Sequence, residues 1–198
     1  NDELLEILSQ ARRPQAVQPH LRKCFDNLVK LRFGDDARST DIHAMISAEG
    51  EEVPFPKPLK ARNSVEKWLS ADGGVEDYMI KSLREETKKG WKAYAEMQRK
   101  AWVLEQYCQV MITVGSIYWT KETEEVFQNA DGNKVQLMGK WFNKNKTQLE
   151  GLTELIRDKL TKLQRKGIVA LVTQDVHNRD IIEKLFIDKI TNIMSFKW

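Results

Sequence analysis

The chain has 198 residues, of which 41% are hydrophobic and 31% are charged. This length and apolar content allow one or two modest cores, which argues against a disordered protein. The 32 basic and 29 acidic residues leave a net charge of only +3, and Lys and Glu alternate along residues 81–92. This pattern indicates solvated helix faces and argues against a nucleic-acid-binding protein.

The cysteines and the hydropathy of the chain indicate in which cellular compartment it is expected. Cys24 and Cys108 have no close partner in sequence, so we expect no disulfide framework and a reducing, cytoplasmic environment. No apolar run reaches membrane-spanning length, and the first residues lack the features of a signal peptide. The chain starts without Met and ends at Trp198. We therefore expect the chain to be a piece of a longer protein. From its hydropathy we expect no membrane partner.

Two helices are predicted at the start of the chain. Leucines at helical spacing indicate a helix over residues 2–11, which the Arg-Pro pair at Pro14 ends. A second helix follows, in which Pro19 is tolerated only in the first turn. This helix is predicted to bury four apolar residues: Val17, Leu21, Phe25 and Leu28.

Residues 42–55 alternate between apolar and polar types around an acidic turn, which predicts a β-hairpin. Glu49, Gly50 and Glu51 form its tip, where Gly50 suits a positive φ angle. Three prolines within residues 54–58 argue against further strand pairing. We therefore place a domain boundary at residue 60, between a helix pair with a hairpin and a helical bundle over residues 61–198.

The bundle is predicted to contain several amphipathic helices. One starts near Asn63 and is interrupted at residues 72–74, and a single helix covers residues 101–128. Two long helices follow the loop at residues 129–133, either joined at a junction marked by Gly167 or continuous as one bent helix. The predicted fold class is all-α, an elongated helical bundle with one small β-hairpin near the N-terminus.

The sequence offers little support for catalysis. Gly132 and Gly139 are separated by six residues where a phosphate-binding loop has four, and Trp141 replaces its Ser or Thr. The three histidines are scattered, and neither cysteine has a partner at metal-ligand spacing. We therefore predict no catalytic residue, no cofactor, no metal site and no enzymatic activity. The six tryptophans favour core packing, with Trp119 as a candidate for a half-exposed interface.

Five blocks of sequence carry a family resemblance. They are residues 1–55, which include ISAEGE, and the segments SVEKWL, MIKSL, QVMITVGSIYWT and LVTQDVHNRDIIEKL, in this order. Together they resemble the C-terminal part of the dynein heavy chain linker, and the final FKW resembles the segment that leads toward the first AAA+ module. ISAEGE and IYWT are more similar to axonemal than to cytoplasmic dyneins. Two departures are an insertion-like stretch at residues 71–74 and residues 106–109, where a usual Trp-Pro-Gly-Gln break is predicted to be helical.

The resemblance implies a mechanical function. In dyneins the linker bends and straightens over a ring of AAA+ ATPase modules and moves the tail relative to the microtubule-binding stalk. The implied partners are the AAA+ ring of the same heavy chain and the rest of the linker and tail, with microtubules contacted only indirectly. The implied location is the axoneme of a cilium or flagellum.

Three polar residues on the last predicted helix, His177, Arg179 and Asp180, interrupt an apolar stripe. Under the resemblance they are candidates for anchoring on the first AAA+ module, and the hairpin is a candidate contact to a neighbouring surface. A non-enzymatic helical scaffold or adaptor that binds a partner helix remains the alternative, because the same apolar stripes support it. A nucleotide hydrolase would require the phosphate-binding loop that the sequence lacks.

Overall fold

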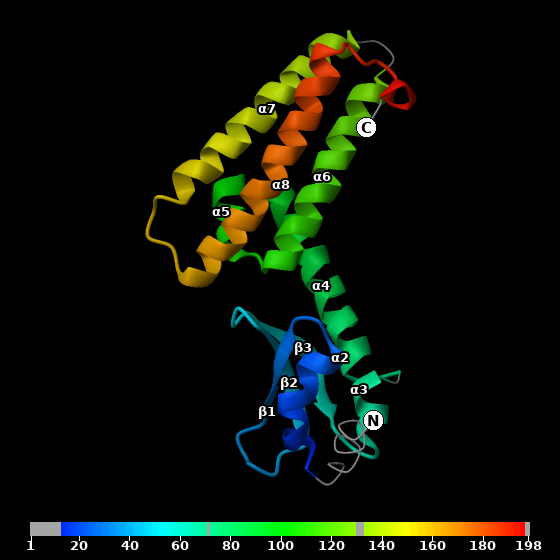
Figure 1. Ribbon diagram of the computed structural model, residues 1–198, viewed down its shortest axis with the longest axis vertical. Coiled ribbons are helices and arrows are strands. Elements are labelled where there is room, and N and C mark those ends of the chain that lie inside the picture. Colours follow the sequence, from blue (N-terminus) through cyan, green and yellow to red (C-terminus); the bar gives the residue numbers. More distant parts are fainter. Residues whose placement is uncertain (1–12, 71, 130–132, 197–198) are drawn as a thin grey trace. The chain divides into compact units, whose positions relative to one another are not determined.

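The computed structural model describes residues 13–70, 72–129 and 133–196 (Figure 1). The described part is mainly helical and has a small three-stranded antiparallel sheet near the N-terminus, which confirms the predicted fold class. The helix predicted over residues 2–11 lies outside the described residues. None of the described helices combines the length and apolarity that a membrane crossing requires.

The chain divides into two compact units, Asn1–Lys88 and Lys89–Trp198. The domain boundary predicted at residue 60 stays a prediction, because packing within one chain does not test which part folds alone. The first unit contains η2 Pro14–His20, α2 Leu21–Cys24, β1 Leu28–Phe33, β2 Asp41–Ser47, β3 Glu52–Lys60, α3 Val65–Ser70 and the first part of α4 Val75–Glu96. The second contains the end of α4, α5 Arg99–Glu105, α6 Cys108–Gln128, α7 Lys134–Leu155, α8 Lys162–Ile187 and η3 Ile193–Ser195.

The second predicted helix is much shorter than expected. Pro19 lies inside a 3₁₀ segment, the helix ends at Cys24, and Phe25 is extended. Leu28 is buried, as predicted, but it begins strand β1, which pairs with β2. The prediction of a helix through Leu28 was wrong because apolar residues near this point also fit one face of a strand, and the backbone ladder with β2 decides between the two.

The predicted hairpin is confirmed as strands β2 and β3, to which β1 adds a third strand in the order β1-β2-β3. Strand β3 continues to Lys60, so the prediction that the prolines end strand pairing was wrong. Because β3 is an edge strand, it needs N–H donors on one side only. Pro54 pairs with Ala44, and the other two prolines lie where the register shifts before Ile42 pairs with Leu59.

The helical unit departs from the prediction at two junctions. A break at Gln106 and Tyr107 separates α5 from α6, where a single helix was expected. The junction between α7 and α8 lies at residues 156–161, because Thr161 caps α8 in a capping box with Gln164. Gly167 lies inside α8, where a Cβ atom would come within 3.0 Å of the Met111 side chain. Close packing on α6 therefore explains this glycine.

Helices α6, α7 and α8 pack against one another around two apolar clusters (Figure 1). The first, which we call the Trp102 cluster, has these buried members: Trp102, Val103, Val110, Met111, Val114, Leu152, Leu155, Ile168 and Leu171. The second, the Trp141 cluster, has these: Met138, Trp141, Ile182, Leu185 and Phe196. Burial at 3.6-residue spacing on each helix accounts for this arrangement.

Candidate functional site

The hairpin tip is a closed polar turn. The Ser47 N–H donates to the Glu51 carbonyl at 2.9 Å, and the Gly50 N–H donates to the Ser47 carbonyl at 3.0 Å. Gly50 has a φ angle of +89°, which favours glycine, as predicted. The Glu49 carboxylate accepts a hydrogen bond from the Asn27 side chain at 2.9 Å. Glu49 and Gly50 are exposed and Glu51 is half-buried, so the tip offers a small acidic surface.

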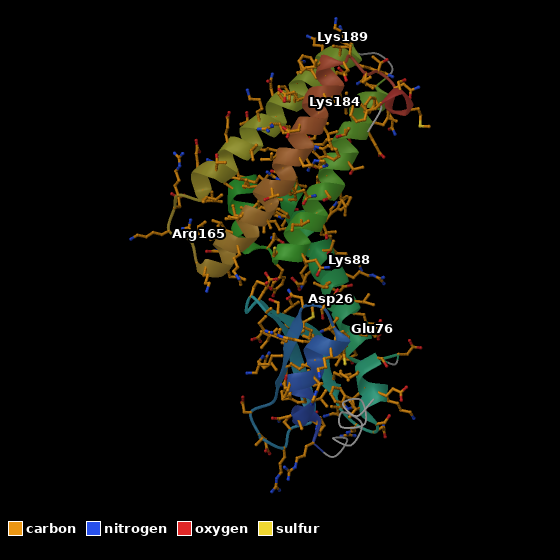
Figure 2. The ribbon with its side chains drawn as sticks, viewed as in Figure 1. Asp26, Glu76, Lys88, Arg165, Lys184 and Lys189 are labelled. Carbon is orange, nitrogen blue, oxygen red and sulfur yellow. The ribbon has the colours of Figure 1, made fainter. Side chains whose placement is uncertain are left out.

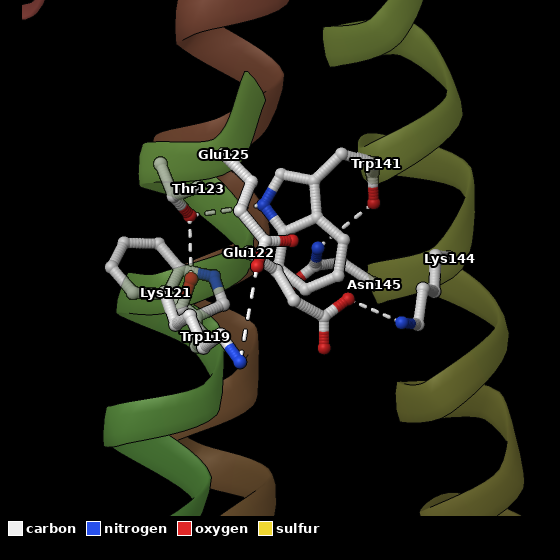
Figure 3. A network of polar contacts seen from close by, with 8 residues as sticks. All are labelled: Trp119, Lys121, Glu122, Thr123, Glu125, Trp141, Lys144 and Asn145. Carbon is white, nitrogen blue, oxygen red and sulfur yellow. Dashed lines mark hydrogen bonds and ion pairs between the residues drawn. The ribbon is translucent and has the colours of Figure 1, made fainter. Parts of the chain in front are cut away.

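A polar network connects α6 and α7 inside the Trp141 cluster (Figure 3). The Trp141 indole N–H donates to the Thr123 hydroxyl at 3.0 Å, and that hydroxyl donates to the Trp119 carbonyl at 2.7 Å. The Asn145 amide donates to the Trp141 carbonyl at 2.8 Å. The Thr123 hydroxyl therefore bonds to the backbone of its own helix and accepts the one hydrogen bond of this network's interior that runs from α7 to α6.

Charged side chains border this network. Lys144 pairs with Glu122 and also lies over the Trp141 ring, with its Nζ atom 5.3 Å from the ring centroid (Figure 3). Trp119 is half-buried and packs on the Trp141 cluster. Its indole nitrogen is buried and has no hydrogen-bond partner within the described residues. The network thus combines buried hydrogen bonds with a cation–π contact of Lys144 on the Trp141 ring.

The polar residues predicted on the last helix lie on α8. His177 and Asp180 are exposed, and Asp180 accepts hydrogen bonds from its neighbour Arg179 at 2.9 and 2.5 Å. Asn178, between them, is 8% exposed and points into the packed side of the helix. The seven predicted interaction residues therefore lie on three elements, and the structure leaves their proposed contacts untested.

Sequence reasoning missed an ion pair between α5 and α8. The Arg99 guanidinium donates to both Asp175 oxygens, at 2.6 and 3.1 Å, and the two side chains are only 15% and 13% exposed. Burial favours a lower pKa for Arg99, but the hydrogen bond and charge of Asp175 outweigh it, so the pKa of Arg99 is raised. The Arg99 Nε atom has no hydrogen-bond partner within the described part of the chain.

A signal for this pair was present in the sequence. Asp175 is four residues after Leu171 and seven before Ile182, both of which are buried on α8. A carboxylate on the buried face of a helix needs a partner, because an unpaired buried charge is costly. The identity of the partner could not be read, since Arg99 lies 76 residues away.

Stacked aromatic rings lie next to this ion pair. The Tyr94 ring stacks on Tyr118 with a centroid distance of 4.2 Å and meets Trp102 edge-on at 4.9 Å. The Trp102 indole N–H donates to the Gly90 carbonyl at 2.9 Å. Burial raises the pKa of the Tyr94 hydroxyl, although Arg99 opposes the shift. These contacts connect the end of α4 to α5 and α6.

The described residues contain no group of three His, Cys, Asp or Glu side chains that could hold a metal ion. Three of the described contacts join one helix to another, namely Arg99 with Asp175, Trp141 with Thr123 and Lys144 with Glu122, and their physical effect is to resist sliding between helices. This arrangement suits a mechanical or scaffolding part.

The comparisons with known proteins point in the same direction. Residues 1–90 match the family described as Dynein heavy chain, N-terminal region 2. The whole chain is 42% identical over 201 residues to Dynein axonemal heavy chain 3 of Mus musculus, and 40% identical over 215 residues to Dynein axonemal heavy chain 6 of Homo sapiens. It is 37% identical over 204 residues to the Dynein-1-beta heavy chain, flagellar inner arm I1 complex, of Chlamydomonas reinhardtii.

The coverage of these matches is unequal. All of this chain is aligned in each case, but it spans only 5%, 5% and 4% of the respective relatives. Residues 1–90 are thus similar to the dynein heavy chain N-terminal region, and the whole chain is similar to axonemal dynein heavy chains at about 40% identity.

Proposed function

We propose that this chain is a linker segment of an axonemal dynein heavy chain that transmits force without catalysing a reaction itself. The observation that carries the proposal is the similarity of the entire chain to axonemal heavy chains from mouse, human and Chlamydomonas. In this proposal ATP turnover takes place in AAA+ modules elsewhere in the same heavy chain. The protein would act in the axoneme of a cilium or flagellum.

The packing of the second unit supports this proposal. A lever must resist internal sliding when load is applied, and buried polar contacts with fixed geometry provide such resistance. Arg99 and Asp175 join α5 to α8, while Thr123 and Trp141 join α6 to α7. Both contacts are directional, so helices cannot shift past one another without breaking them.

Two surfaces are proposed as contacts of this lever. His177, Arg179 and Asp180 on α8 would anchor on the first AAA+ module of the parent chain. The hairpin tip, with Glu49, Gly50 and Glu51, would touch a neighbouring surface. Exposure of Glu49, Gly50, His177 and Asp180 supports this assignment. Contact with microtubules would be indirect in either case.

The test of the lever uses a full-length axonemal heavy chain that contains this segment. Asp175→Ala leaves Arg99 buried without its carboxylate and loosens the helical unit. A heavy chain with this substitution should move microtubules in a gliding assay at least about twofold more slowly than the wild type, while its rate of ATP turnover is retained. Glu124→Ala, which removes an exposed carboxylate from α6 of the same unit and touches neither proposed contact surface, is the matched control for folding and charge.

Parallel loss of gliding and ATP turnover would point to a role in the ATPase cycle, and unchanged gliding would contradict the lever. A second variant lacks residues 48–51. If its gliding and ATP turnover equal those of the wild type, the proposed role of the hairpin is wrong.

The alternative is a helical adaptor, which exposed apolar side chains on the second unit favour. Ile187 is 67% exposed and Met194 is 87% exposed. The coding sequence of the parent gene distinguishes the two functions. A lever requires a phosphate-binding loop in the same reading frame, downstream of this segment, and an adaptor does not.

A further inference from the structure

The connector between α7 and α8, taken together with the first residues of α8, departs from the charge balance of the chain. Residues 157–166 contain five basic residues and one acidic residue, a net charge of +4. The whole chain carries +3, so all other residues together sum to −1. No acidic residue occurs between Asp158 and Asp175. Positive charge is thus concentrated in one short segment.

Four of these cations are exposed, and among the described residues only Arg157 has an acidic side chain, Glu154, close enough to interact with it electrostatically. Arg157, Lys159, Lys162 and Lys166 are exposed, and within the described residues none of them forms an ion pair. The fifth basic residue of the segment, Arg165, which Figure 2 labels, donates hydrogen bonds to the carbonyls of Ile156 and Asp158, just after α7. We call Arg157, Lys159, Lys162 and Lys166 the connector cations.

The basic residues at the start of α8 are electrostatically unfavourable there. The N-terminus of an α-helix carries partial positive charge, and acidic residues are favoured in its first turn. Helix α8 has no acidic residue there and begins with Lys162, while Lys166 follows one turn later. The helix dipole therefore adds to the positive potential of the connector. Sequences that violate a local rule without compensation often do so for function.

We propose that the connector cations form a docking surface for a carboxylate-rich protein segment. The side chains suit this partner because lysine and arginine pair with carboxylates over a broad range of geometries. Dense positive charge also attracts an acidic segment over a distance of about 10 Å at moderate salt. The inference goes beyond the proposed lever and does not depend on it.

Other anionic partners fit the connector less well. A single-stranded nucleic acid would require exposed aromatic rings for stacking, and residues 157–166 contain none. A membrane surface would require several exposed apolar side chains beside the cations. Val169 is the exposed large hydrophobic residue nearest in sequence, at 48% exposure. The observations therefore favour protein carboxylates.

The experiment measures binding of a fluorescent oligoglutamate peptide to the whole chain by fluorescence anisotropy. We expect wild-type binding that weakens steeply as salt is raised. A variant with the connector cations replaced (Arg157→Gln, Lys159→Gln, Lys162→Gln, Lys166→Gln) should bind the peptide with an affinity at least about tenfold lower. Glutamine retains helix propensity, and far-ultraviolet circular dichroism verifies that the variant is folded.

The control removes the same charge from exposed lysines elsewhere: Lys30→Gln, Lys57→Gln, Lys67→Gln and Lys92→Gln. This variant should bind within about twofold of the wild type, because the segment at residues 157–166 is intact. Equal loss in both variants would show that net charge alone attracts the peptide and would overturn the proposal. So would absence of wild-type binding, or tighter connector-dependent binding of RNA or of vesicles containing phosphatidylserine.

Discussion

The two units of the chain use polar contacts in different ways. In the first unit, the ion pairs of the sheet lie near its surface: Arg32 on β1 with Glu52 on β3, whose side chains are 47% and 43% exposed, and Lys60 on β3 with Asp41 on β2, at 52% and 34%. In the second unit, Arg99 and Asp175 are 15% and 13% exposed, and the Trp141 indole donates to Thr123 in the interior. Exposed pairs contribute about 0–1 kcal/mol each, whereas breaking a buried pair costs several times more.

This difference reflects what each unit must specify. The sheet fixes its register through its buried apolar face and the turn between β2 and β3, so side-chain pairs add little. Helices carry no ladder between one another, and an apolar seam alone tolerates sliding and rotation. The buried polar contacts of α5 to α8 restrict both motions. The following predictions test this contrast, beginning with the largest effect.

Asp175→Ala should cause the largest loss of stability. The substitution leaves the Arg99 guanidinium buried without its carboxylate, which costs about 3–5 kcal/mol of the free energy of unfolding. Urea denaturation followed by tryptophan fluorescence measures this loss. Hydrogen exchange read by mass spectrometry should place it in α5 and α8, with β2 and β3 unaffected.

Two further variants show whether the loss of stability in Asp175→Ala comes from the unpaired buried charge. Glu52→Ala breaks the exposed pair with Arg32 and should cost less than about 1 kcal/mol. The double variant Arg99→Met and Asp175→Leu removes both buried charges and should recover most of the loss, since apolar replacement of a buried pair is often neutral. A double variant as unstable as Asp175→Ala would mean that packing, and not the unpaired charge, explains the loss.

Thr123→Val should have the next largest effect. Valine has the shape of threonine but cannot accept the hydrogen bond of the Trp141 indole, so a buried N–H loses its partner. The expected cost is about 1–3 kcal/mol of unfolding free energy by urea denaturation. Thr173→Val is the matched control, because the Thr173 hydroxyl is exposed and donates to the Val169 carbonyl of its own helix. Equal costs would rule out a special role for the indole contact.

Two glycine substitutions test how closely the helices approach. A Cβ atom at Gly90 would lie 2.8 Å from the Val110 side chain, so Gly90→Ala forces side chains apart. Its expected net cost is about 1 kcal/mol, because overpacking exceeds the gain in helix propensity. At Gly115 the nearest atom, on Leu171, is 3.6 Å away, and Gly115→Ala should stabilise the chain by about 1 kcal/mol. Thermal unfolding of both variants measures the signs, and a stabilising Gly90→Ala would contradict the close approach.

The sequence predicted the presence of helices and strands better than the residues at which they begin and end. The hairpin, its glycine turn and the long helices followed from hydrophobic period and turn residues, which are local signals. The limits of α2, α5 and α6 did not follow, because long-range contacts decide them. Strand β1 forms only when β2 is present to pair with it. The break after Glu105 separates α5, whose Trp102 contacts Gly90, from α6.

The polar contacts of the second unit show a similar limit. Asp175 on a buried helix face signals that a cation must be near, but periodicity carries no information about which one. Trp141 was expected to pack, and it does, while its hydrogen bond to Thr123 depends on the distance between α6 and α7. Interaction candidates chosen as exposed polar residues stay predictions, since their partners would lie outside this chain or in another part of it.

Asp41→Asn should have the smallest effect, visible only as a change in pH dependence. The hydrogen bond from Lys60 is the largest cause that holds the pKa of Asp41 below its ordinary value of 3.8 in the folded chain. A lowered carboxylate pKa stabilises the fold above the unfolded value, and this contribution is lost as pH falls through the folded value. Wild-type urea midpoints should therefore fall more between pH 7 and pH 3 than those of Asp41→Asn. Asp26→Asn, which removes an exposed carboxylate without an ion pair among the described residues, should retain the wild-type response. An identical response in Asp41→Asn would mean that the exposed strand pair adds nothing to the sheet.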